Sequence, residues 1–124
     1  MNKEKKIKES LKFLIDKGFV FHKYKDDLEE NFVFSGERKD IILTYDIRLN
    51  TIDVGLTINE DKNYIPLLEA NISDKNQIGK LSSDIESIYL FARNDWILSK
   101  KNFNQIVDLY ANFIKENLSD ILNV

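Results

Sequence analysis

Two aspartates, Asp46 and Asp53, are the residues best placed for chemistry. They lie in a segment, Lys39–Asn59, in which apolar and polar residues alternate. Such alternation predicts two antiparallel strands with one buried face. If Leu49 and Asn50 form the turn, the aspartates face each other on the polar side, where like charges repel. The pair could bind a divalent cation, share a proton in catalysis, or present negative charge to a basic partner.

Arg48 lies two residues from Asp46 on the same predicted face and provides a simpler interpretation. An Asp46–Arg48–Asp53 network on the surface would contribute little to stability. We rank the surface network first, partner binding second and catalysis third.

The other residue types argue against an enzyme. His22 is the only histidine and there is no cysteine, so we expect a hydrogen-bonded or edge-exposed strand histidine rather than a zinc ligand or general base. No glycine cluster resembles a phosphate-binding loop. Gly55, in the middle of a predicted strand, could admit a partner backbone, although a bulge or local twist is the more usual cause. We expect no catalytic residue, no metal site and no cofactor.

The alternating segment fixes the expected hairpin register. Its apolar pairs would be Ile47 with Ile52, Tyr45 with Val54, Leu43 with Leu56 and Ile41 with Ile58. Every apolar residue then meets an apolar partner, and a slip of one residue would place the whole set in water.

The remaining elements follow from hydrophobic periodicity. An amphipathic helix is predicted over 3–17 with Gly18 as its C-terminal cap, followed by strands at 19–25 and 32–34. We expect a short helix at 66–70, a polar connection over 73–80 and a helix over 83–92. A long helix is predicted over 102–122, with Asn102 and Gln105 as its capping box, while Trp96 is expected to be a core residue.

This order of elements predicts an α+β fold. We expect an N-terminal helix, a four-stranded antiparallel meander and C-terminal helices packed on one face of the sheet, all in a single domain of residues 1–124. The first residues are charged but no continuous apolar run follows, which argues against a signal peptide. No apolar stretch approaches the roughly 20 residues of a membrane-spanning helix, so we expect a cytoplasmic protein without a membrane partner.

Charge is unevenly distributed along the chain. The formal net charge is −3, with +5 in residues 1–25 and −8 in residues 26–86. The acidic middle could steer a basic partner. The basic first helix supports an alternative, a small regulatory or phage-derived protein that contacts nucleic acid through Lys5, Lys6, Lys8 and Lys12. Glu4 and Glu9 lie among these lysines, and no nucleic-acid-binding motif accompanies them.

The hairpin Tyr45–Val54, with a lysine-rich first helix and an amphipathic last helix, resembles the small immunity proteins of bacterial polymorphic or contact-dependent toxin systems. The resemblance covers most of the chain as an order of elements. It implies a non-enzymatic protein that binds and neutralises a toxin domain. Many such toxins are basic nucleases, so acidic residues on the inhibitor would accelerate association.

We therefore predict a partner-binding surface made of acidic residues, and a basic toxin domain as its partner. Two of the residues lie in the hairpin, two in the turn after it, and two in the acidic loop that follows the first strand. They are Asp46, Asp53, Glu60, Asp61, Glu29 and Glu30.

Overall fold

The computed structural model describes residues 2–60, 62–92 and 98–124. It has the predicted α+β composition, with N-terminal helices, an antiparallel sheet and C-terminal helices. The contacts group into two compact units, Asn2–Glu69 and Ala70–Val124, which are described separately. The single domain expected from the sequence stays a prediction. Over the described ranges, no helix combines the length and apolar character needed to cross a membrane.

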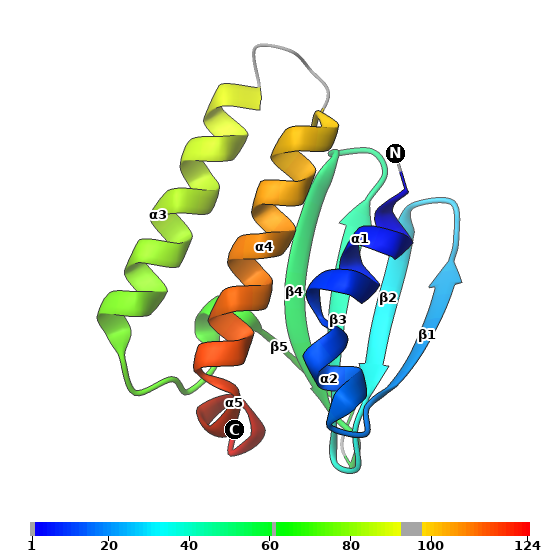
Figure 1. The fold of residues 1–124 in the computed structure, drawn as a ribbon, viewed down its shortest axis with the longest axis vertical. Helices are drawn as coiled ribbons and strands as arrows, with labels where there is room; N and C mark the ends of the chain where they lie inside the picture. The colour runs from blue at the N-terminus through cyan, green and yellow to red at the C-terminus, as the bar shows by residue number, and fades with distance from the viewer. Residues whose placement is uncertain (1, 61, 93–97) are drawn as a thin grey trace. The chain divides into compact units, whose positions relative to one another are not determined.

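The sheet of the first unit is an antiparallel meander in which each strand pairs with the next along the chain (Figure 1). It has five strands where the sequence predicted four. They are β1 (Val20–Lys25), β2 (Glu29–Ser35), β3 (Lys39–Asp46), β4 (Thr51–Ile58) and β5 (Asn63–Pro66). The additional strand ends at Pro66, which the sequence interpretation assigned to a helix. Proline is tolerated on an edge strand, and only a 3-10 turn, Leu67–Glu69, follows it.

The β3–β4 hairpin is longer at its turn than predicted. Tyr45 lies opposite Ile52 and Leu43 opposite Val54, so the pairing differs from the predicted register by two residues. The expected two-residue turn is wrong, because residues 47–50 all lie between the strands. The shift is an even number of residues, so the side chains within the strands keep their predicted faces. The predicted Ile47–Ile52 pair is wrong, because Ile47 lies in the turn and is exposed.

Turn chemistry explains the longer connection. The Asp46 carboxylate accepts hydrogen bonds from the backbone N–H groups of Arg48 at 3.0 Å and Leu49 at 2.9 Å. Asn50 adopts the left-handed conformation, with φ of 54°, which asparagine tolerates better than most residues. These local bonds favour a four-residue turn over the shorter one that hydrophobic alternation alone suggested.

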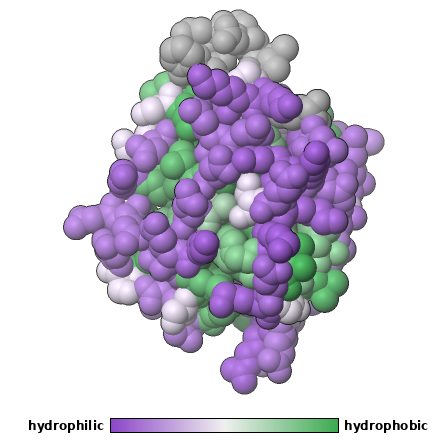
Figure 2. All heavy atoms as spheres, viewed as in Figure 1, coloured by the Kyte–Doolittle hydropathy of each residue, from purple (hydrophilic) through white to green (hydrophobic). Residues whose placement is uncertain are grey.

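Two short helices, α1 (Lys3–Ser10) and α2 (Lys12–Asp16), lie across one face of the sheet (Figure 1). The predicted continuous helix over 3–17 is interrupted at Leu11. Three residues of its predicted apolar stripe, Ile7, Leu11 and Leu14, are fully buried, whereas the fourth, Ile15, is exposed. Gly18 has φ of 99°, which confirms the predicted left-handed cap. Hydrophilic side chains cover most of the solvent side of α1 (Figure 2).

The second unit contains α3 (Lys75–Ala92), α4 (Lys100–Glu116) and α5 (Leu118–Leu122). The third helix begins well before the predicted residue 83. The Asp74 carboxylate accepts hydrogen bonds from the N–H groups of Asn76 and Gln77, at 3.1 and 3.2 Å, and so caps the helix. The predicted polar connection over 73–80 is therefore mostly helical.

The predicted long helix also differs at both ends. It begins at Lys100, and Ser99 rather than Asn102 is its N-cap, because the Ser99 hydroxyl accepts from the Asn102 N–H at 3.1 Å. It stops at Glu116, where the Asn117 side-chain amide donates to the Phe113 carbonyl at 3.0 Å and to Gln77 of α3 at 2.8 Å. Trp96 lies outside the described residues.

Candidate protein-binding surface

Three of the predicted acidic residues meet on one face of the sheet. We call the face opposite α1 and α2 the outer face. Glu29 of β2 lies directly opposite Asp46 of β3, and Asp53 of β4 lies opposite Thr44, two residues along from Asp46. The predicted head-on Asp46–Asp53 pair is therefore wrong. The two aspartates are diagonal neighbours, and the directly facing acidic pair is Glu29–Asp46.

These carboxylates influence one another electrostatically. Desolvation raises the pKa of Asp53, and the nearby Asp46 charge raises it further. Among the described residues, neither Glu29 nor Asp53 has an ion-pair partner. The expected Asp46–Arg48–Asp53 network is also absent there, because Arg48 contacts Asp46 through its backbone N–H. Within residues 2–60, 62–92 and 98–124, the carboxylates of Glu29, Asp46 and Asp53 thus have no ion-pair partner.

Tyr64 of β5 belongs to this surface, and the sequence interpretation missed it. The residue is 47 % exposed, and the pKa of its phenol is raised by desolvation and then by the charges of Asp53 and Glu29. Its ring lies against Gly55, where an added Cβ would be 2.2 Å from the ring. Gly55 pairs in regular register with Ile42 of β3 and with Pro66 of β5. The strand therefore has no bulge at this position, although a bulge is the more usual reason for a glycine in a strand. The glycine in the middle of a strand was the only signal in the sequence for a close neighbour at this position. That neighbour is the Tyr64 ring of the same chain and not the backbone of a partner.

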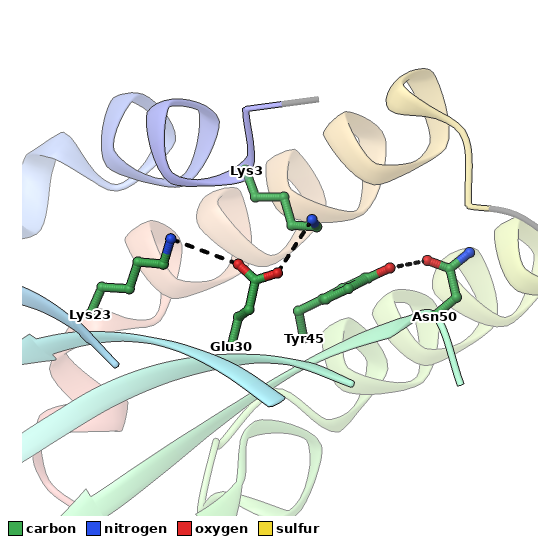
Figure 3. A network of polar contacts seen from close by, with 5 residues as sticks. All are labelled: Lys3, Lys23, Glu30, Tyr45 and Asn50. Atoms are coloured by element: carbon green, nitrogen blue, oxygen red, sulfur yellow. Dashed lines mark hydrogen bonds and ion pairs between the residues drawn. The ribbon is translucent and has the colours of Figure 1, made fainter. Parts of the chain in front are cut away.

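Glu30 lies on the other face and has a structural role. Its carboxylate is 3.5 Å from the Lys3 ammonium and 3.8 Å from that of Lys23 (Figure 3). Lys3 also lies 4.6 Å from the centre of the Tyr45 ring, and the Tyr45 hydroxyl donates to Asn50. The two glutamates expected together in a loop are the first residues of β2, so they alternate between faces. Glu30 is therefore not part of the outer face.

The other predicted residues lie apart from this group. Glu60 is exposed in the turn after β4, at the end of that strand far from Asp46, and Asp61 lies outside the described residues. His22 is exposed, and its Nε2 lies 2.9 Å from the Ser35 hydroxyl, which confirms the hydrogen-bonded strand histidine. In the part of the chain that the structure describes, no three histidine or acidic side chains are grouped as metal ligands.

The lysines of the first helices make contacts within the protein. Lys8 lies 5.0 Å from the centre of the Phe21 ring, and Lys12 lies 3.6 Å from the Asp16 carboxylate on the next turn. The Lys12–Asp16 and Lys3–Glu30 ion pairs offset part of the positive charge on which the nucleic-acid alternative depends, while Lys8 keeps its full charge beside a neutral ring. They therefore favour the acidic outer face as the candidate functional surface.

Comparisons with protein families, curated proteins and solved structures find no match to this chain. The class of protein must therefore be argued from the chemistry of the outer face.

The raised pKa of Asp53 predicts a pH-dependent stability. The folded state holds this proton more tightly than the unfolded state, so the free energy of unfolding should fall as pH rises between the unfolded-state pKa and the higher folded-state pKa. Asp53→Asn removes the cost of holding a charged carboxylate at this position. It should stabilise the protein by about 0.2–1 kcal/mol at about pH 7, with no gain at about pH 3. Urea unfolding at both pH values would measure this difference. Glu86→Gln, at an exposed position of α3, makes the same change in charge and is the control. Equal stability of Asp53→Asn and the wild type near neutral pH would contradict the prediction.

Proposed function

We propose that the protein is a non-enzymatic binding module that neutralises a cognate bacterial toxin domain, as immunity proteins do. One observation carries the proposal, the placement of Glu29, Asp46 and Asp53 on neighbouring strands without a basic partner among the described residues. A fold ordinarily avoids like charges at such positions, since each repulsive pair costs stability. A basic partner would remove that cost upon binding.

The chemistry of the surface supports a protein partner. Tyr64 is a half-exposed aromatic residue beside the carboxylates, and tyrosine is enriched among the residues that dominate binding energy at interfaces. The sheet gives the site a rigid backbone, which limits the entropy lost on association. Acidic residues on such a platform would attract the basic surface with which a nuclease toxin binds its substrate, and would block that surface.

Binding to the toxin domain encoded beside this chain should give a 1:1 complex whose association slows as salt rises. Glu29→Gln combined with Asp53→Asn should lower the association rate by about ten-fold at low salt, while the dissociation rate changes less. Stopped-flow mixing over a range of salt concentrations would measure both rates. Asp46 is left unchanged because its carboxylate also closes the β3–β4 turn.

The matched control is Glu9→Gln combined with Glu37→Gln. These glutamates are exposed, one on α1 and the other in the turn between β2 and β3, at the end of the sheet far from Asp46. The control makes the same change in net charge, so its association rate should stay close to that of the wild type. The absence of a complex with the toxin domain, or equal slowing by both double variants, would overturn the proposal.

A further inference from the structure

Two turns of the sheet are joined at the end that carries Asp46. The β1–β2 turn (26–29) and the β3–β4 turn (46–50) meet there, because the Ile47 N–H donates to the Leu28 carbonyl at 2.9 Å. We call these residues together the turn-end surface. It adjoins the outer face, since Glu29 and Asp46 belong to both.

The turn-end surface exposes three large aliphatic side chains. Leu49 is 69 % exposed, Leu28 47 % and Ile47 38 %. Single exposed aliphatic residues are common on protein surfaces, but these three lie on two turns that a backbone hydrogen bond joins, and we call them the apolar patch. The patch is therefore a candidate for the desolvated centre of an interface.

Side-chain caps hold both turns in place. The Asp26 carboxylate accepts from the N–H groups of Leu28 and Glu29, each at 2.8 Å, and these bonds hold the pKa of Asp26 below its usual range. The Asp46 carboxylate likewise accepts hydrogen bonds from the N–H groups of Arg48 and Leu49. Because the backbone is already ordered, an apolar contact here would cost little additional conformational entropy.

The charge around the patch indicates which kind of partner could bind it. The turn-end surface carries four acidic residues and one basic residue, Arg48. A second copy of the chain would bring the same negative charge to a symmetric contact, and an anionic membrane would be repelled. A protein segment with lysine or arginine around an apolar side chain matches both the charge and the patch.

We infer that the turn-end surface is the apolar centre of the binding interface, and that Leu28, Ile47 and Leu49 receive an apolar side chain that basic residues flank on the partner. This inference rests on the proposed function and deepens it, because it names the chemistry of the segment that the protein recognises. The carboxylates of the outer face would accelerate encounter, while the aliphatic contact would slow dissociation.

Short peptides can test the inference without the natural partner. One peptide alternates lysine with leucine, a second alternates lysine with serine, and a third alternates glutamate with leucine. Each peptide is titrated into isotope-labelled protein, and the backbone amide chemical shifts are recorded. Only the lysine–leucine peptide should change the chemical shifts of residues 26–29 and 46–50 at low concentration. Leu28→Ser combined with Leu49→Ser should weaken its binding by about ten-fold or more.

The matched control is Ile15→Ser combined with Val20→Ser. Both residues are exposed, and they lie near the start of β1, at the other end of the sheet from the turn-end surface. Its affinity for the lysine–leucine peptide should equal that of the wild type, and urea unfolding would verify that both double variants are folded.

The possible outcomes separate this inference from the proposed function. Equal binding of the lysine–serine and lysine–leucine peptides would retain an acidic docking face but overturn the aliphatic contact, as would unchanged affinity in Leu28→Ser/Leu49→Ser. Concentration-dependent shifts of residues 26–29 and 46–50 without peptide would show self-association and overturn the basic partner. Binding of the lysine–leucine peptide without binding of the toxin domain would support the inference and remove the proposed function. If no peptide binds, the inference fails.

Discussion

Replacement of Phe32 by alanine should lower the free energy of unfolding by about 3–5 kcal/mol. Phe32 is fully buried in the middle of β2, between Leu43 of β3 and Lys23 of β1 in the strand ladder. The substitution removes a large apolar surface from the core and leaves a cavity that two paired neighbours prevent from closing. The substitution also removes a cation–π contact, since the Lys23 ammonium lies 5.5 Å from the centre of the Phe32 ring.

Urea unfolding would measure the loss, with Tyr24→Ala as the control. Tyr24 is an aromatic residue of the same hairpin, but it is 53 % exposed on the outer face. Its truncation should cost less than about 1 kcal/mol, because most of its surface is already in contact with water. Similar losses for the two variants would show that Phe32 is not part of the core.

The second large effect should distinguish two glutamates that are adjacent in the sequence. Glu30→Ala should destabilise the protein by about 1–3 kcal/mol, because it leaves the partly buried Lys3 and the more exposed Lys23 without their shared carboxylate. Glu29→Ala should be neutral or slightly stabilising, because Glu29 faces Asp46 across the ladder. Urea unfolding of both variants would give the comparison.

Tyrosine titration supplies a second measurement for this pair. Burial raises the pKa of Tyr45, and the charge of Glu30 raises it further, so Glu30→Gln should lower the pKa of Tyr45 toward its usual range. Glu29→Gln should instead lower the pKa of Tyr64. An equal loss of stability in Glu29→Ala and Glu30→Ala, or no change in the pKa of Tyr45, would contradict the assignment of the two residues to opposite faces.

Hydrophobic alternation was sufficient to predict strands β3 and β4 and the faces of their side chains. The period of two residues in Lys39–Asn59 placed Ile41, Leu43 and Tyr45 on one face, and these residues are buried. Alternation cannot determine the length of a turn, because pairings that differ by two residues bury the same face. The turn was decided by Asp46, whose hydrogen bonds to backbone N–H groups no periodicity describes.

Helix boundaries were missed for a related reason. Asp74 and Ser99 act as N-caps through one side-chain oxygen each, and neither belongs to an apolar stripe. The strand β5 was missed because it is short and ends in proline. Turn and cap residues therefore determine where helices and strands begin and end, and the hydrophobic pattern alone does not locate these boundaries.

The candidate site was predicted in part. Asp46 and Asp53 share the predicted face, the predicted Glu29 joins them from β2, and the structure adds Tyr64 from β5. Glu30 was misplaced because the sequence interpretation treated 26–30 as a loop, where alternation has no meaning. In a strand, neighbouring residues point to opposite faces, so the start of β2 at Glu29 decides which glutamate is available to a partner.

The strand order β1-β2-β3-β4-β5 has a consequence for how the chain acquires its structure. Every ladder joins strands that are consecutive in the sequence, so no pairing waits for a distant segment, and less loop-closure entropy is lost than in a sheet with crossover connections. All five strands are complete once Pro66 has been synthesised. We expect the sheet to form on the ribosome before α4 has left the exit tunnel.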